Sequence, residues 1–214
     1  MMLIEAGSKL IMTGDSVTDC DRGRPVGEGL FGAIGNGYVN FVQANLMAKY
    51  PENRIRVVNM GSTGNTIRDL KGRWETDIVE QEPDWLSVMI GINDVWRQFD
   101  SPLETERHVY LEEYSQTLEV LVSSTKPLLK GLVLMTPYYI EPNVNDSMRW
   151  TMDKYGAIVK SISQKYSTCF VDTQVAFNKI FEHYHPNLIS WDRVHPNNIG
   201  HMVLAQAFLK AIEF

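Results

Sequence analysis

The sequence is short of cysteine, of long apolar runs and of clustered positive charge. Only 2 cysteines occur in 214 residues, Cys20 and Cys169, and neither lies in a CxxC pair, which excludes a disulfide framework. No stretch approaches the roughly 20 apolar residues that span a bilayer. The N-terminus MMLIEAGSKLIM lacks the basic start and apolar segment of a signal peptide. We therefore expect a cytoplasmic, reduced protein with no membrane partner.

Charge limits the class of partner further. Lys and Arg number 20 against 26 Asp and Glu, a formal net charge of −6, and basic residues occur only in short runs such as Arg54-Ile55-Arg56. Nucleic-acid binding would favour a basic stripe on the surface. We expect no nucleic-acid partner. The length predicts a single domain, 1–214, large enough for a core between two helical layers.

Apolar runs and helical patterns alternate along the chain. The runs predict five strands, at 9–14, 55–60, 84–91, 131–137 and 169–172. Their near-continuous hydrophobicity is typical of parallel strands buried on both faces. Helical spacing predicts helices at 35–50, 66–81, 107–125, 147–166 and 197–212. This alternation indicates an α/β fold, a three-layer α/β/α sandwich with a five-stranded parallel sheet of flavodoxin-like type. The irregular stretches 17–35, 92–105, 137–147 and 185–196 are long enough to be functional.

Polar residues follow three consecutive predicted strands. The first strand ends at Gly14-Asp15-Ser16, the second enters NMGSTGNT (59–66), and the third enters GIND (91–94). Ligands of an open parallel sheet bind beyond the carboxyl ends of its strands. Ser16, Gly64 and Asn93 are therefore expected at one edge of the sheet.

A fourth polar segment, WDRVHPNNIGH (191–201), precedes the last predicted helix. Asp192 and His195 lie three residues apart in it, a spacing that lets a carboxylate orient the imidazole ring. A serine hydroxyl needs such a base to become a nucleophile, and triads are recognised by their roles rather than by chain order. The Ser16 N–H, the Gly64 N–H and the Asn93 side-chain amide are candidate donors to an oxyanion.

Each of these residues also has a purely structural explanation. Gly14-Asp15-Ser16 has the composition of an ordinary turn, and Asn93 could cap the helix after its strand. Gly64 could serve turn geometry alone, and Asp192 with His195 could be a surface pair. Their joint occurrence at successive strand ends favours the catalytic interpretation.

The four segments GDSVTD, GSTGNT, GIND and DRVHP resemble the four sequence blocks of the SGNH, or GDSL-type, hydrolases. The resemblance implies the SGNH hydrolase fold, Ser16 as nucleophile, His195 as base and Asp192 as its partner. It also implies an oxyanion hole of the Ser16 amide, Gly64 and Asn93, with no cofactor. The chain departs from the family pattern in GDSV for GDSL and in Thr63 for a common serine. Neither change removes a catalytic group.

Further segments are similar to the intracellular acetylxylan esterases of this superfamily: 22–38, 89–98, 134–143 and 191–196. That similarity implies a serine esterase that removes acetyl groups from xylo-oligosaccharides or related sugars through an acetyl-enzyme intermediate. Asp15, Trp96 and Trp191 are assigned to the substrate-binding surface, and Asp15 is also expected to hold its loop through backbone N–H groups. Exposed aromatic side chains make a homo-oligomer a further expectation.

Other functions were compared with this hypothesis. A thioesterase or lysophospholipase of the same superfamily would act on longer acyl chains. A flavodoxin-like nucleotide or flavin binder would need a phosphate-binding loop, but GDSVTDCDRG has neither GxGxxG nor GxxxxGK[ST]. A carbohydrate-binding module without activity would not need every catalytic residue. We expect no metal, because no HExxH or comparable ligand set occurs, and His201 is expected to pack within the last helix.

Overall fold

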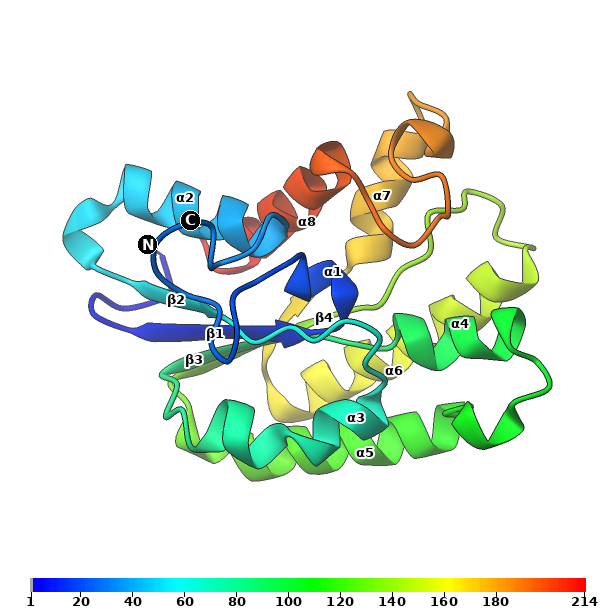
Figure 1. The fold of residues 1–214 in the computed structure, drawn as a ribbon, viewed down its shortest axis with the longest axis horizontal. Helices are drawn as coiled ribbons and strands as arrows, with labels where there is room; N and C mark the ends of the chain where they lie inside the picture. The colour runs from blue at the N-terminus through cyan, green and yellow to red at the C-terminus, as the bar shows by residue number, and fades with distance from the viewer. Residues whose placement is uncertain (1) are drawn as a thin grey trace.

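A parallel β-sheet runs through the centre of the computed structural model, which describes residues 2–214 (Figure 1). Its five strands have the order β2-β1-β3-β4-β5, and every neighbouring pair is parallel. They are β1 (Lys9–Gly14), β2 (Arg56–Asn59), β3 (Trp85–Met89), β4 (Gly131–Met135) and β5 (Cys169–Val171). Each lies within one of the predicted runs, so the predicted sheet is confirmed.

Helices cover both faces of this sheet. In Figure 1, α2, α7 and α8 lie on one side of the strands, and α3, α5 and α6 lie on the other. Contacts within each layer join α2 to α8 and α5 to α6. The α-helices are α1 (Ser16–Asp19), α2 (Tyr38–Lys49), α3 (Ile67–Gly72), α4 (Ile92–Asp100), α5 (Leu111–Thr125), α6 (Ser147–Tyr166), α7 (Thr173–Phe181) and α8 (Asn198–Ala211). The expected three-layer sandwich is therefore confirmed.

Five short helical turns complete the secondary structure of residues 2–214. Four are 3₁₀ turns: η1 (Pro51–Asn53), η3 (Thr105–Arg107), η4 (Lys126–Leu128) and η5 (Pro186–Leu188). The fifth, η2 (Glu75–Val79), is a π-helical turn that follows α3. The helix predicted over 66–81 is therefore two pieces, separated near Gly72.

Two helices differ from the sequence analysis. Residues 92–105 are predicted as irregular, but the structure places α4 over Ile92–Asp100. Asn and Asp in its first turn are weak helix formers, and burial of Ile92 and Val95 outweighs that preference. The sequence predicts no element over 173–181, where the structure has α7, which begins where the Asp172 side chain accepts the Val175 N–H at 2.9 Å.

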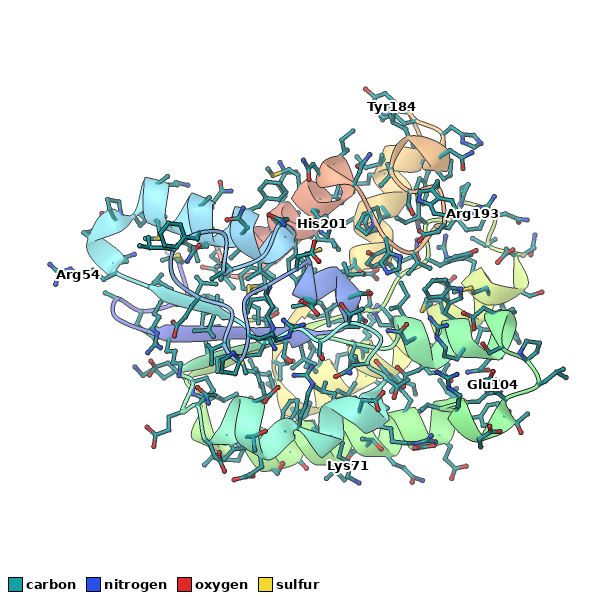
Figure 2. The ribbon with its side chains drawn as sticks, in the orientation of Figure 1. Arg54, Lys71, Glu104, Tyr184, Arg193 and His201 are labelled. Atoms are coloured by element: carbon teal, nitrogen blue, oxygen red, sulfur yellow. The ribbon has the colours of Figure 1, made fainter. Side chains whose placement is uncertain are left out.

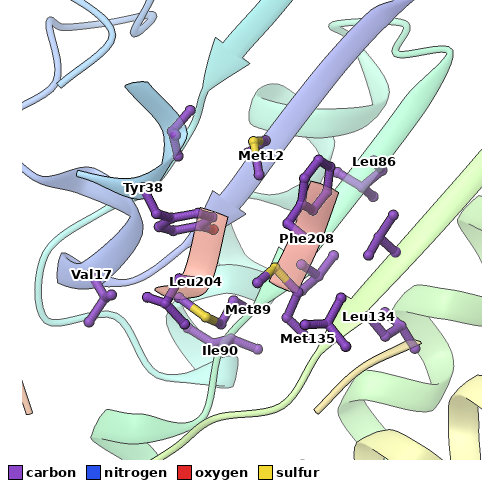
Figure 3. Close-up of a cluster of buried hydrophobic side chains, with 14 of the residues drawn as sticks. Met12, Val17, Tyr38, Leu86, Met89, Ile90, Leu134, Met135, Leu204 and Phe208 are labelled. Carbon is purple, nitrogen blue, oxygen red and sulfur yellow. The ribbon is translucent and has the colours of Figure 1, made fainter. Parts of the chain in front are cut away.

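The core lies between the sheet and the two helical layers. Figure 3 shows side chains of β1, β3 and β4 meeting Leu204 and Phe208 of α8 and Tyr38 of α2. All five residues of β3 are buried, as expected for a strand covered on both faces. Within residues 2–214, no helix combines the length and the apolar character that crossing a membrane requires.

The strand order decides where a site can form. From β1 the chain passes to β2 on one side, and it later returns to β3 on the other side of β1. The connections after β1 and β3 therefore diverge, which leaves a crevice at the carboxyl ends of these strands. Ser16 follows β1 and Asn93 follows β3, so both residues lie at this crevice.

Candidate active site

Ser16 begins a single helical turn, α1, two residues after the end of β1. The end of β1 lies so close to the end of β3 that position 14 requires glycine, because a Cβ there would lie 2.2 Å from the Met89 carbonyl oxygen. Asp15 caps the turn, and its Oδ1 accepts the Val17 N–H at 3.0 Å. The backbone of this turn thus presents the Ser16 side chain at the edge of the sheet.

Asp15 itself is buried, with 2% of its surface exposed. Burial raises the pKa of its carboxyl group to about 7, although the hydrogen bond from Val17 opposes that shift. Little of Asp15 is therefore open to a substrate, and its assignment to the substrate-binding surface stays a prediction. Its carboxyl group caps the turn that carries Ser16, as the alternative expectation held.

A continuous hydrogen-bonded chain joins Ser16, His195 and Asp192. The Ser16 Oγ lies 3.0 Å from His195 Nε2, and His195 Nδ1 lies 2.7 Å from Asp192 Oδ2. Residues separated by almost the whole chain therefore meet at hydrogen-bond distance. With Nδ1–H donating to the carboxylate, Nε2 is free to accept the Ser16 proton.

Asp192 is held as an anion. Its Oδ1 accepts the backbone N–H groups of Val194 and His195 at 2.9 Å each, and the Ser190 hydroxyl at 2.8 Å. Partial burial alone would raise the pKa of Asp192, but the hydrogen bonds from His195, the two backbone groups and Ser190 lower it to about 2. The carboxylate is therefore ionised at neutral pH and fixes the tautomer of His195.

The loop that carries this pair is tied to the segment after β4. The Tyr138 hydroxyl donates to the Val194 carbonyl at 3.2 Å, and the Ile140 N–H donates to the Arg193 carbonyl at 3.0 Å. An ion pair also joins Arg193 to Glu141. Figure 2 shows Arg193 on this loop, above α4 in that view. These contacts hold His195 in place although it lies on an irregular segment.

Two of the predicted oxyanion donors lie on the connections after β2 and β3. Gly64 is exposed, with a φ of +80° that glycine adopts without strain, and within residues 2–214 no hydrogen bond engages its N–H. Asn93 is buried in the first turn of α4, and its Nδ2 donates to the Asn65 carbonyl at 3.0 Å. The Asn93 amide has a second N–H for another acceptor.

The Gly64 loop is joined directly to the turn that carries Ser16. Asp19 ends α1, is 2% exposed, and accepts both the N–H and the hydroxyl of Thr63 at 2.8 Å through Oδ2. Arg24 also donates to this oxygen at 2.5 Å. Burial opposes ionisation of Asp19, but the hydrogen bonds from Arg24 and Thr63 lower its pKa overall. Thr63, which departs from the family pattern, thus keeps the hydroxyl that this contact uses.

The two tryptophans assigned to the substrate surface have different environments. The Trp96 ring on α4 is half-buried and meets the His195 ring edge-on, with centroids 5.7 Å apart. Trp191 is 88% exposed. Trp96 therefore lies beside His195, and Trp191 presents its ring to solvent next to Asp192.

His201 lies inside the helical layer (Figure 2). Its Nδ1 accepts the Tyr38 N–H at 3.2 Å, and its Nε2 lies 3.3 Å from Cys20 Sγ. Burial lowers the pKa of His201 to about 4 and raises that of Cys20 to about 12. Both groups are neutral, so the predicted packing role of His201 is confirmed. Among residues 2–214, no three His, Cys, Asp or Glu side chains are grouped to hold a metal ion.

Sequence reasoning missed the charged residues that contact Asn93 and its partner Asn65. Arg97 donates to Asn93 Oδ1 at 3.3 Å, and Arg73 donates to Asn65 Oδ1 at 2.6 Å and to the Gly14 carbonyl at 2.9 Å. The four-residue spacing of Asn93 and Arg97 is the signal of a helical contact. Because the sequence analysis predicts 92–105 as irregular, this spacing does not indicate a contact until α4 is known.

Comparisons with known proteins agree with this geometry. A model of the GDSL-like lipase/acylhydrolase family matches residues 12–203. An acetylxylan esterase from Geobacillus stearothermophilus is 59% identical over 213 residues, which cover 100% of this chain and 97% of that protein. A crystal structure of an acetylxylan esterase from that organism, at 59% identity, has a TM-score of 0.98 and covers 100% of this chain and 97% of its own.

Two further sets of solved structures are similar. Catalytic mutants of that esterase carry alanine in place of a serine, an aspartate or a histidine, at 58% identity to this chain with 100% of this chain and 97% of theirs covered, and with TM-scores of 0.98 to 0.99. An alpha/beta hydrolase enzyme from the metagenome of Lake Arreo, Spain, is 51% identical, with a TM-score of 0.98 over 100% of this chain and 98% of its own.

Proposed function

The chain belongs to the GDSL-like lipase/acylhydrolase family and is a carboxylic ester hydrolase, and we propose that it removes acetyl groups from acetylated xylo-oligosaccharides. The observation that carries the proposal is the chain of contacts from Ser16 through His195 to Asp192, at 3.0 and 2.7 Å. The name of its esterase relative supports the substrate class. That relative's catalytic mutants replace the same three residue types, which supports the roles.

In the proposed acylation step, His195 Nε2 takes the Ser16 proton while Oγ attacks the acetyl carbonyl carbon. The carbonyl oxygen becomes an oxyanion, and the N–H groups of Ser16, Gly64 and Asn93 donate to it. The bond from carbon to the sugar oxygen then breaks. The imidazolium returns the proton to that oxygen, which leaves a free sugar hydroxyl and an acetylated Ser16.

Deacylation repeats these steps with water. His195 takes a proton from water as the oxygen attacks the acetyl carbon, and the same donors stabilise the second oxyanion. Collapse of this intermediate breaks the bond to Ser16 Oγ, which receives the proton from His195, and acetate leaves. Ionised Asp192 stabilises the imidazolium in both steps.

The exposure of the site fits a bulky sugar leaving group. The His195 side chain is 45% exposed, and Gly64 faces solvent. An oligosaccharide can therefore approach with its acetyl group while the sugar rings stay outside the fold. The thioesterase, lysophospholipase and nucleotide-binding alternatives are not favoured, because relatives at 59% identity are named acetylxylan esterases.

The test is hydrolysis of acetylated xylo-oligosaccharides, followed by acetate release, together with p-nitrophenyl acetate, butyrate and octanoate. We expect turnover of the acetylated sugar and a steep fall in kcat/KM beyond acetate. Ser16→Ala should abolish both activities and leave the thermal unfolding temperature near that of the wild type. A rate that rises toward octanoate would refute the acetyl specificity, and Ser16-independent hydrolysis would refute the triad.

We also retain two expectations as proposals. Cys20 and Cys169 are both free thiols, which supports a reducing compartment such as the cytoplasm. Phe31 and Trp191 are fully or largely exposed, which supports self-association. Cell fractionation tests the first proposal, and light scattering of the purified protein tests the second.

A further inference from the structure

We propose that Arg97 is a positioning residue, which orients the side-chain amide of Asn93 so that its N–H faces the oxyanion. The proposal rests on the function proposed above, in which Asn93 is one of three oxyanion donors. It assigns to Arg97 a role in the rate of the reaction without contact with the reacting atoms.

The contact follows from the geometry of α4. Asn93 and Arg97 are four residues apart on this helix, so their side chains lie on the same face. The Arg97 guanidinium donates to Asn93 Oδ1 at 3.3 Å, and the opposite end of the amide, Nδ2, donates to the Asn65 carbonyl at 3.0 Å. The oxygen of the buried amide therefore has a donor as partner and the nitrogen has an acceptor. Only one orientation of the amide satisfies both contacts.

Rotation of this amide by half a turn would reverse both contacts. Nδ2 would then face the guanidinium of Arg97, a donor against a donor, and Oδ1 would face the Asn65 carbonyl, an acceptor against an acceptor. An acceptor would also occupy the position from which Asn93 donates to the oxyanion. Because Asn93 is 2% exposed, water cannot readily satisfy the reversed groups.

Arg97 is itself held in place from two other directions. It forms an ion pair with Asp100 one turn further along α4, and its guanidinium lies over the Trp96 ring, 4.5 Å from the centroid. The same Trp96 ring meets His195 edge-on. The Arg97 side chain is 25% exposed, so its contact with Asn93 is shielded from most of the solvent.

The Asn65 carbonyl provides the second half of this arrangement. The Asn65 side chain accepts from Arg73 Nε at 2.6 Å, and Arg73 also donates to the Met60 and Gly14 carbonyls. This carbonyl therefore remains in place when Arg97 is changed. Loss of Arg97 removes one of the two contacts that select the amide orientation, so the effect should be smaller than loss of the donor itself.

The expected effect is a fall in kcat of about tenfold for Arg97→Met, which corresponds to about 1.4 kcal/mol. Loss of a complete oxyanion donor costs roughly 100- to 1,000-fold. Because the oxyanion exists only in the transition state, kcat and kcat/KM should fall together while KM stays within about twofold. A residue that binds the sugar would mainly raise KM.

A double-mutant cycle with Asn93→Ala tests the proposal on the full-length protein with p-nitrophenyl acetate. If Arg97 acts through Asn93, Arg97→Met lowers kcat about tenfold in the wild type and less than twofold in the Asn93→Ala background. An equal fall in both backgrounds would overturn the proposal, because Arg97 would then act independently of the amide.

Arg107→Met is the matched control, because Arg107 forms an ion pair with Glu104 at the same three-residue separation as Arg97 with Asp100. It should leave kcat unchanged. Should Arg97→Met fail to fold, Arg97→Leu, which also lacks a donor, enters the same cycle under the same criterion. Ser16→Ala separates the two hypotheses: an active Ser16→Ala variant refutes the proposed function, whereas an inactive one with an additive cycle refutes only the role of Arg97.

Discussion

Replacing Asp192 with asparagine changes one atom of the proposed triad and should nearly abolish turnover. In the wild type, Asp192 Oδ2 accepts from His195 Nδ1 at 2.7 Å, which leaves Nε2 facing the Ser16 hydroxyl as a proton acceptor. An asparagine oxygen can still accept the two backbone N–H groups and the Ser190 hydroxyl at the Oδ1 position. Its NH₂ group then replaces Oδ2 and donates to Nδ1. The proton of His195 would move to Nε2, which could then no longer accept the proton of Ser16.

The structure separates this tautomer effect from loss of charge. The pKa of Asp192 is about 2, against 3.8 for the free side chain, so its surroundings favour the ionised form by about 2.5 kcal/mol. Only part of this belongs to His195, because Ser190 and two backbone groups also donate. Taken as the scale for loss of the charge alone, this free energy corresponds to about 60-fold, at about 1.4 kcal/mol for each factor of ten. Inverting the tautomer removes the base and brings the expected fall in kcat to roughly 1,000- to 10,000-fold.

The assay compares kcat for p-nitrophenyl acetate at neutral pH in the wild type and Asp192→Asn, with unfolding temperatures to check the fold. Asp172→Asn is the control, because Asp172 is also an aspartate that accepts a backbone N–H at a helix start, and it lies outside the site. A fall of about 60-fold or less for Asp192→Asn would refute the tautomer argument. A fall below tenfold would exclude Asp192 as the partner of His195.

Three further outcomes are expected. Asn93→Ala should lower kcat by roughly 100- to 1,000-fold with little change in KM, because the donor acts on the oxyanion; a pure KM effect, in steady-state kinetics, would contradict this role. Thr63→Val should lower kcat by about three- to tenfold, because the loop loses a hydrogen bond to Asp19 worth about 1 kcal/mol, and Thr63→Ser should restore the rate; equal rates for all three proteins would exclude the contact from catalysis. Asp94 is fully buried, and burial raises its pKa to about 8 although it accepts the Ile67 N–H. Because the pKa is raised, the folded state binds the Asp94 proton more tightly than the unfolded state does. The stability that this proton contributes is fully present below about pH 4 and is lost as the pH rises toward 8. Asp94→Asn removes this ionisation, so the unfolding temperature of the variant, measured relative to that of the wild type, should rise between pH 5 and pH 8. A difference that stays constant across this range would contradict the raised pKa.

The arrangement of the sheet was predictable because parallel strands leave a strong local pattern. All five strands lie where continuous apolar runs occur, since burial on both faces requires it. The same topology brings strand ends to one edge, so the sequence predicts that residues 16, 64 and 93 lie near one another. Asp192 and His195 could be paired from the sequence because they lie three residues apart in a single loop.

Other features depend on burial, which a local pattern does not report. Asp15 and Ser16 are adjacent in sequence, yet one is buried under the turn and the other reaches His195. Helix α4 forms against the propensity of its first residues because its apolar side chains complete the core. Without that helix, the contact of Asn93 with Arg97 could not be anticipated.

The sequence by itself determined the order of the elements, the residue types at the ends of the strands and hence the kind of chemistry available. These properties are local, because periodicity and motif spacing depend only on residues that are close together in the sequence. Only the tertiary structure decided which carboxylate accepts from His195, which one caps the turn of Ser16, and which charged side chains contact Asn93 and Asn65. Such roles depend on distances of about 3 Å between segments far apart in the chain, and these distances exist only after the layers have packed.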